Sequence, residues 1–283
     1  MDRRFTQKVA VVTGVSDRGI GGAIAERLAA EGAAVAALFF GDRPQRLFKK
    51  LARIGEPVLP VHCDVTDEAS VREAVDAVMA EFGQIDALVN NAGLDKASLL
   101  ENQTDADWSA ILDVNLTGAM RMSRACLPYL TEPGGVIVSL SSALASNASA
   151  GFAAYSASKA GLNGLTQAMA AELAPTGRRA CCVAPALCHT PMSHQHLGEA
   201  TEEDMAQIGR AHPLGMGISA DVAAAVAFLA SDEARWVTGA TLPMGHFPQF
   251  ALPHEAMSGT RAQADPAAGD APRPKLGVLG GVS

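Results

Sequence analysis

The stretch KVAVVTGVSDRGIGGAIAERLAAEGAAVAALFF, residues 8–40, decides the fold. It joins an apolar run at 8–13 to a second apolar run at 33–40 through a glycine-rich turn and a segment with helical spacing at 21–32. Strands of a parallel sheet that is covered on both faces are apolar along their whole length, and a helix usually connects two of them. The stretch therefore predicts a strand–helix–strand unit of a parallel sheet.

The same alternation continues along most of the chain. Further strands are predicted at 85–93, 134–142 and 179–185, and further helices at 70–83, 104–130, 153–173 and 219–231. This rhythm predicts an α/β fold with a parallel sheet and helices on both faces. We assign residues 1–250 to a single domain. Residues 251–283 are rich in Ala, Pro and Gly and lack periodicity, which predicts a tail that is flexible or that docks on another subunit.

Composition and charge argue against several classes of protein. The formal net charge is −8 and lysine and arginine form no dense cluster, which disfavours binding to nucleic acid or to an anionic membrane surface. The start does not resemble a signal peptide, and no apolar stretch is long enough to span a bilayer. The five cysteines include no CxxC pair, which favours buried thiols in a reducing compartment. We therefore expect a cytoplasmic protein whose partner is a small molecule.

The glycine-rich turn indicates a nucleotide site. Gly14, Gly19 and Gly21 lie between the first strand and the helix that follows it. Backbone amides at a helix N-terminus bind a pyrophosphate, and glycine lets that backbone approach closely. The alternative is an ordinary glycine-rich turn without a ligand.

A second pattern carries proton chemistry. Tyr155 precedes Lys159 by four residues, in a chain that has only two tyrosines. Residues at this spacing share one face of a helix. A phenol has a pKa of about 10, and a neighbouring ammonium favours the phenolate and lowers that pKa. The pair is therefore either an acid–base site or a surface contact on an ordinary helix.

These two patterns occur together with several short motifs. The motifs are Thr13-Gly14…Gly19-Ile20-Gly21, CDVTD (63–67), NNAG (90–93), Asn115 in VNLTG, Ser142, YSASK (155–159) and FLASDEARWVTGATLP (228–243). Over about residues 6–245 the chain resembles the short-chain dehydrogenase/reductase family, in the subgroup similar to 3-oxoacyl reductases and related alcohol dehydrogenases. The resemblance implies a Rossmann-type, doubly wound parallel sheet of about seven strands in a homodimer or homotetramer. It also implies NAD(P)-dependent hydride transfer between a carbonyl and a secondary alcohol.

The resemblance assigns the catalytic roles. Tyr155 would be the general acid or base at the substrate oxygen, and Lys159 would hold the nicotinamide ribose. Ser142 would stabilise the charge that develops on that oxygen. Asn115 would hold a water that links Lys159 to solvent.

For the cofactor, the resemblance implies a larger set of residues. These are Gly14, Ser16, Arg18, Gly19, Ile20, Phe40, Arg43, Asp64, Val65, Asn91, Tyr155, Lys159, Pro185 and Thr190. NADP(H) is favoured, because Phe39 and Phe40 stand where NAD-binding members carry an acid, and Arg18 and Arg43 would bind the 2′-phosphate. NAD(H) stays open, since Asp42 could turn toward a ribose. Asp64 has a competing interpretation as a helix cap.

Three positions depart from the family pattern. The glycine loop has one extra residue, which predicts a bulge near Ser16–Arg18. Ala186 stands after Pro185 where the family usually has glycine, and MGHF (244–247) stands where Asp-Gly-Gly usually follows the last strand.

Substrate residues follow from family position alone. The predicted pocket residues are Leu94, Ala143, Leu144 and Phe152, with Met205 as a lid contact. His194 and His196 are interpreted as solvated, and no metal site is predicted. His189 or His212 could contact substrate, and an exposed loop histidine is the alternative.

The alternative function is a non-catalytic, cofactor-binding scaffold or sensor of the same fold. The presence of Ser142, Tyr155 and Lys159 together counts against it. A cofactor-free lyase of the same fold, such as a halohydrin dehalogenase, would lack the glycine loop and carry arginine in place of Lys159.

Overall fold

A seven-stranded sheet forms the centre of the computed structural model, which describes residues 3–198 and 200–245. Its strands are β1 (Val9–Val12), β2 (Ala34–Phe39), β3 (Val58–His62), β4 (Ala87–Asn90), β5 (Val136–Leu140), β6 (Arg179–Pro185) and β9 (Thr241–Met244). They lie in the order β3-β2-β1-β4-β5-β6-β9, and every neighbouring pair is parallel. The predicted doubly wound parallel sheet is confirmed.

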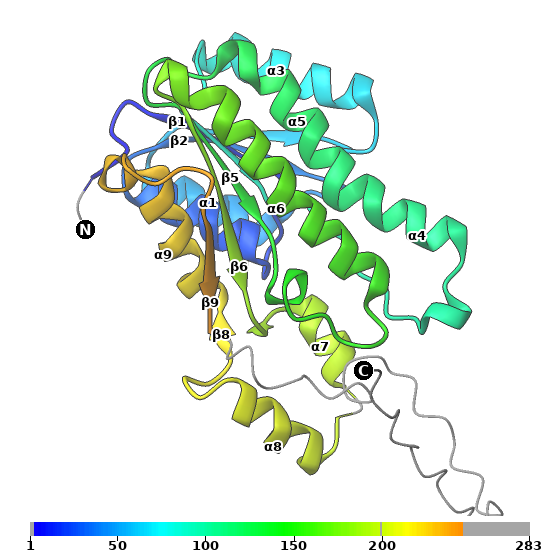
Figure 1. Ribbon diagram of the computed structural model, residues 1–283. Helices are drawn as coiled ribbons and strands as arrows, with labels where there is room; N and C mark the ends of the chain where they lie inside the picture. Colours follow the sequence, from blue (N-terminus) through cyan, green and yellow to red (C-terminus); the bar gives the residue numbers. More distant parts are fainter. Residues whose placement is uncertain (1–2, 199, 246–283) are drawn as a thin grey trace, which may run out of the picture.

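Helices cover both faces of this sheet (Figure 1). One face carries α1 (Ile20–Ala30), α2 (Gln45–Ile54) and α9 (Ser219–Ala230), and the other carries α3 (Glu68–Phe82), α5 (Gly118–Cys126) and α6 (Ala153–Leu173). Two shorter helices, α7 (Pro191–Leu197) and α8 (Glu202–Ala211), lie beyond the end of β6, next to a small pair of strands, β7 (Cys188–His189) and β8 (Gly217–Ile218). None of the described helices is both long and apolar enough to cross a membrane.

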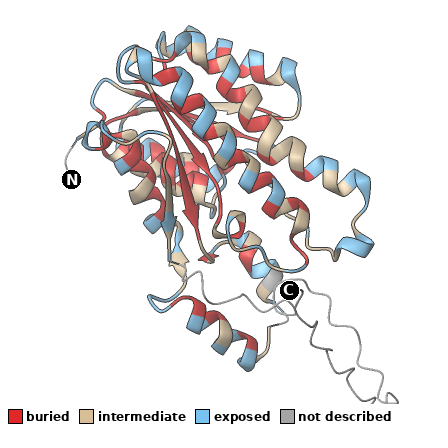
Figure 2. Cartoon of the chain, viewed as in Figure 1, coloured by how far each residue is buried: buried red, intermediate tan, exposed pale blue. Residues whose placement is uncertain are grey.

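The apolar strands explain the layers. In β1, Ala10 and Val12 belong to the core on the α1 and α9 face, whereas Val9 and Val11 belong to the core on the α3 and α5 face. Successive side chains of a strand point to opposite faces, so a strand that is covered on both sides must be apolar throughout. Figure 2 shows the strands buried almost throughout, while most helices bury only one side.

The helix predicted at 104–130 is not continuous. α4 covers Asp105–Leu112, a π-helical turn covers Asp113–Thr117, and α5 continues from there. A π-turn inserts one residue into a helix, and such insertions are frequent at functional sites. Asn115, one of the predicted catalytic residues, is the buried residue of this turn.

The sequence pattern did not predict α2 or β3. Only Leu47 and Leu51 of α2 are buried, so its apolar stripe is narrow. β3 is an edge strand that contains Pro60, and its residues are half-buried or exposed. Proline is tolerated at a sheet edge, where its missing N–H leaves no ladder bond unmade. The predicted division at residue 250 stays a prediction, because residues 251–283 lie outside the described part of the chain.

A buried arginine ties β6 to the end of α9. The Arg179 guanidinium donates hydrogen bonds to the carbonyl oxygens of Leu229 at 2.8 Å, Val237 at 3.2 Å and Ser231 at 3.2 Å. The last carbonyls of a helix have no partner within the helix, and Arg179 supplies the Leu229 carbonyl with one. The other two carbonyls have a second donor each, the Ala234 amide for Ser231 and the Cys181 thiol for Val237.

We expect Arg179→Met to lower the free energy of unfolding by about 2 kcal/mol, because it removes three hydrogen bonds and leaves the buried Leu229 carbonyl without this donor. Urea unfolding followed by circular dichroism measures this change. Arg235→Met is the matched control, since Arg235 is exposed in the same region and its loss should change stability by less than about 0.5 kcal/mol. Equal stability of the two variants would contradict the anchoring role.

Candidate active site

The carboxyl ends of β1, β4, β5 and β6 open into one cavity of about 690 Å³. β1 pairs with β2 on one side and with β4 on the other, so the winding of the chain reverses between β1 and β4. In open α/β sheets, ligands bind outside the carboxyl ends of the strands at this point of reversal. The predicted cofactor residues that line the cavity are Gly14, Ser16, Gly19, Ile20, Phe40, Asp64, Val65, Asn91, Tyr155, Lys159, Pro185 and Thr190.

The glycine loop needs its glycines. Gly14 has a φ of +67°, and a Cβ on it would lie 2.7 Å from the Cα of Ala92. A Cβ on Gly21 would lie 2.7 Å from the carbonyl oxygen of Gly14. α1 begins at Ile20 with Gly19 as its N-cap and no side-chain cap, so its first amides are available beside the cavity.

Two hydrogen bonds hold the part of the loop that contains the extra residue. One lies within the loop, and the other joins the loop to α2. The Ser16 hydroxyl accepts a bond from the Gly19 amide at 3.0 Å. The Asp17 carboxylate accepts one from the Leu47 amide at 2.9 Å, in the first turn of α2. α2 has no side-chain cap of its own, so Asp17 takes that role from thirty residues away and fastens the loop to α2.

The two arginines predicted at the 2′-phosphate do not line the cavity. Arg18 is exposed, and the guanidinium of Arg43 lies over the ring of Phe48, 4.7 Å from its centroid. Phe40, at the end of β2, is 70% exposed and does line the cavity. The Phe40 ring therefore lies where the ribose was expected, and the two arginines lie outside the cavity.

Asp64 forms a turn instead of capping a helix. Its Oδ1 accepts bonds from the Thr66 amide at 2.9 Å and from the Thr66 hydroxyl at 2.7 Å. The N-cap of α3 is Asp67, whose carboxylate accepts a bond from the Ala69 amide at 2.9 Å. Asp64 therefore lies in the cavity wall, held by its own turn.

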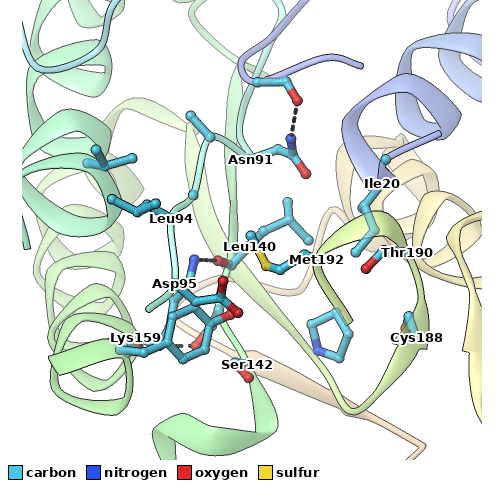
Figure 3. A pocket seen from close by; sticks show the side chains of 18 of the residues that line it. Ile20, Asn91, Leu94, Asp95, Leu140, Ser142, Lys159, Cys188, Thr190 and Met192 are labelled. Atoms are coloured by element: carbon cyan, nitrogen blue, oxygen red, sulfur yellow. Dashed lines mark hydrogen bonds between the residues drawn. The ribbon is translucent and has the colours of Figure 1, made fainter. Parts of the chain in front are cut away.

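The ends of β1 and β4 are cross-linked by hydrogen bonds. Thr13 Oγ1 accepts bonds from the Asn91 and Ala92 amides, both at 3.0 Å. Asn91 Nδ2 donates to the Thr13 carbonyl at 2.9 Å and to the Gly14 carbonyl at 3.0 Å (Figure 3). Asn91 therefore fixes the glycine loop as well as lining the cavity, a structural role that the motif alone did not reveal.

Ser142, Tyr155 and Lys159 meet at the other end of the cavity. Ser142 follows β5 and is buried, and its hydroxyl oxygen accepts a bond from the Leu144 amide at 3.1 Å. Tyr155 and Lys159 lie in the first turns of α6, on one face of the helix as predicted. The Lys159 ammonium donates to the Leu140 carbonyl at 2.7 Å and lies 5.5 Å from the centroid of the Tyr155 ring (Figure 3).

The electrostatics of the pair differ from the sequence-based expectation. Burial raises the pKa of Tyr155 above its usual range, the Asp95 carboxylate acts in the same direction, and a hydrogen bond with Ser142 opposes them. Burial lowers the pKa of Lys159 to about 8. The neighbouring ammonium was expected to lower the phenol pKa, whereas the pKa of Tyr155 is raised in this structure, because burial penalises the phenolate.

Asn115 does not line the cavity. Its side-chain oxygen accepts a bond from the Leu94 amide at 2.7 Å, and its Nδ2 donates to the Leu94 carbonyl at 2.8 Å and to Ser158 Oγ at 3.0 Å. Asn115 thus joins the segment after β4 to α6. Its predicted contact with a water of a proton relay stays a prediction.

Most predicted pocket residues lie where expected. Leu94, Ala143, Leu144 and Phe152 line the cavity, whereas Met205 lies on α8, is 42% exposed and is not among the lining residues. Asp95 and Cys188 also line it and were not predicted, because no motif includes them. Met192, one of the methionines expected to form an apolar lid over the pocket, lines the cavity too. The described residues contain no group of three or more His, Cys, Asp or Glu suited to a metal ion. The side chain of His196 lies outside the described part of the chain.

A cavity at the point of reversal, with helix amides at one end and a buried phenol at the other, is typical of dinucleotide-dependent oxidoreductases. A family model described as enoyl-(acyl carrier protein) reductase matches residues 14–245. The 3-oxoacyl-[acyl-carrier-protein] reductase FabG of Escherichia coli (strain K12) is 38% identical over 241 residues, which cover 84% of this chain and 96% of that protein. FabG of Thermotoga maritima is 37% identical over 242 residues, with 83% and 95% coverage.

Solved structures agree with these relatives. A short chain dehydrogenase from Burkholderia cenocepacia J2315 in complex with NADP superposes with a TM-score of 0.80 at 38% identity, covering 87% of this chain and 99% of that one. The chain belongs to the short-chain dehydrogenase/reductase family and is an NAD(P)-dependent oxidoreductase, similar in sequence to 3-oxoacyl reductases.

We expect Asp17→Ala to lower the free energy of unfolding by about 1 kcal/mol, because it removes the cap of α2. Since the same contact fastens the glycine loop, the KM for the dinucleotide should also rise. Thermal unfolding and cofactor saturation curves measure the two effects. Asp76→Ala, which removes an exposed carboxylate on α3 that does not line the cavity, is the control and should leave both values unchanged.

Proposed function

We propose that the chain reduces a carbonyl compound to a secondary alcohol, or catalyses the reverse, with Tyr155 as the general acid or base. The observation that carries this proposal is that Ser142, Tyr155 and Lys159 line the same cavity as the glycine loop. The nicotinamide cofactor supplies or accepts the hydride. The chain's own residues bind it, orient the substrate oxygen and handle the proton.

The arrangement of the three side chains supports distinct roles. A neutral Tyr155, favoured by burial, can donate its phenolic proton to the substrate oxygen. Ser142 Oγ already accepts a bond from Leu144, so its own hydrogen is directed elsewhere and suits the oxygen on which charge develops. Lys159 is held by the Leu140 carbonyl beside the phenol ring, close enough to contact a ribose at the same end of the cavity.

NADP(H) is the preferred cofactor in this proposal. The uncapped start of α1 and the glycine loop fit a pyrophosphate, and the cavity volume leaves room for a dinucleotide. No acid stands at the end of β2, and Arg18 and Arg43 are close in sequence to the lining residues Gly19 and Phe40. A relative of the same fold was solved with NADP. Binding of the 2′-phosphate would require Arg43 to leave its contact with Phe48.

We also propose a cytoplasmic homodimer or homotetramer. Trp236, between α9 and β9, is 97% exposed in the single chain, and a tryptophan side chain is highly buried on average. All five cysteines are free and buried, which suits a reducing compartment.

We expect Tyr155→Phe to lower kcat/KM for carbonyl reduction by about a hundredfold to ten-thousandfold, because it removes the general acid. Loss of nicotinamide absorbance measures the rate. Tyr129→Phe is the matched control: Tyr129 is the other tyrosine of the chain and lies 42% exposed at the end of α5, so its variant should keep full activity. Full activity of Tyr155→Phe with intact cofactor binding would favour the scaffold alternative.

We expect titration of nicotinamide fluorescence to show tighter binding of NADPH than of NADH. Arg18→Met and Arg43→Met should each weaken NADPH binding about tenfold and leave NADH binding unchanged, because only the 2′-phosphate gains from a guanidinium. Arg53→Met, an exposed arginine in the last turn of α2, is the control. A preference for NADH would overturn the cofactor assignment without affecting Tyr155.

A further inference from the structure

The wall of the cavity that follows β4 contains an acidic residue, Asp95. The segment around it, Leu94–Ser98, is fixed at both ends. At Leu94, the Asn115 side chain bonds both the amide and the carbonyl of the backbone. At Ser98, the amide donates to the Gly151 carbonyl at 2.8 Å and the residue forms an isolated β-bridge with Phe152. Asp95 is therefore presented by a braced wall next to the catalytic helix.

Asp95 acts on the catalytic pair. It lines the cavity together with Ser142, Tyr155 and Lys159, and its side chain extends into the same part of the cavity as Lys159 and Ser142 in Figure 3. Its charge adds to the raised pKa of Tyr155 and, after that of Cys182, opposes the lowering of the Lys159 pKa by burial. Because all these side chains line one part of the cavity, the carboxylate lies near the place where the substrate oxygen must lie.

The surroundings of Asp95 are mainly apolar. Leu94, Leu144, Phe152, Leu187 and Met192 line the same end of the cavity. The neighbouring Lys96 forms an ion pair with Asp107 on α4, at 2.8 Å, and does not line the cavity. Lys159 is the other charged residue at this end, and its ammonium donates to the Leu140 carbonyl. In an otherwise apolar pocket a few placed polar groups fix the orientation of a ligand and provide specificity.

We propose that Asp95 determines the substrate class: a carbonyl compound with a hydrogen-bond donor, hydroxyl or ammonium, on a carbon within one or two bonds of the carbonyl. The proposal rests on the proposed reductase function. A carboxylate accepts strong hydrogen bonds and offers none when ionised. It therefore favours a donor beside the reacting carbonyl and disfavours a carboxylate or a second carbonyl there.

The experiment compares kcat/KM for three ketones with NADPH. Hydroxyacetone carries a hydroxyl, aminoacetone carries an ammonium, and butan-2-one carries no donor. We expect the full-length chain to prefer at least one of the two donor ketones over butan-2-one by about tenfold to a hundredfold, the discrimination given by one hydrogen bond to a charged group. Ethyl 3-oxobutanoate, with a second carbonyl, should be reduced no better than butan-2-one.

Two variants separate charge from hydrogen bonding. In Asp95→Ala, the preference for the donor ketones should fall to within about threefold, because the acceptor is gone. Asp95→Asn keeps an acceptor oxygen but loses the charge, so a preference for hydroxyacetone should persist in part while a preference for aminoacetone is lost. Asp105→Asn, an exposed position on α4, is the control and should preserve the ratios of the unaltered chain.

The outcomes distinguish this inference from the function on which it rests. An unaltered chain that reduces butan-2-one or ethyl 3-oxobutanoate better than both donor ketones overturns the role of Asp95 and leaves the reductase standing. Ratios of kcat/KM between the donor ketones and butan-2-one that do not change in Asp95→Ala also overturn the role of Asp95 and leave the reductase standing. A chain that reduces none of the four compounds, with either cofactor, overturns the proposed function and this inference together.

A pH profile provides a second measurement that does not depend on the substrate ratio. Because Asp95 raises the pKa of both Tyr155 and Lys159, its neutralisation in Asp95→Asn should lower both. Alcohol oxidation requires an ionised Tyr155, so the rising limb of kcat/KM for oxidation of propane-1,2-diol should move to lower pH. If the rising limb of kcat/KM lies at the same pH in Asp95→Asn as in the unaltered chain, Asp95 does not act on the reacting groups.

Discussion

The hydrogen bonds between the ends of β1 and β4 are the constraint on which the rest of the site depends. Thr13 Oγ1 accepts hydrogen bonds from two backbone amides that follow β4. Asn91 Nδ2 donates hydrogen bonds to the carbonyl oxygens of Thr13 and Gly14. The glycine loop leaves β1 at this point, and the wall that contains Asp95 leaves β4 there. One small set of bonds therefore sets the distance between the phosphate end of the cavity and the proton end.

A second constraint is that burial acts on two neighbouring groups of opposite kind: Tyr155 is neutral when protonated, whereas Lys159 is charged when protonated. Burial alone raises the pKa of Tyr155, which favours a neutral phenol, and lowers the pKa of Lys159. Asp95 acts on both groups and favours their protonated forms. A protonated Tyr155 is the form that can donate a proton to a carbonyl oxygen. Any positive charge that a bound oxidised nicotinamide brings would act in the opposite sense.

The sheet could be predicted from the sequence because its strands are apolar along their whole length and are separated by segments with helical spacing. α2 and β3 escaped prediction because each buries few side chains, and β3 contains Pro60. Tyr155 and Lys159 could be predicted to share one helix face from their spacing, whereas the place of Ser142 beside them followed from the resemblance to the family. The pKa of Tyr155 could not be predicted, since it depends on burial and on Asp95, which comes from a different strand end.

The extra residue of the glycine loop illustrates how such a fold absorbs change. An insertion beside a phosphate site would be expected to loosen it, yet Asp17 uses the added length to cap α2 and Ser16 folds back on Gly19. These two hydrogen bonds hold the glycine loop at the phosphate end of the cavity. At the proton end, backbone hydrogen bonds at Leu94 and Ser98 brace the wall that carries position 95. A side chain on a braced wall of the cavity is one of the places where chains of one fold can come to differ in substrate.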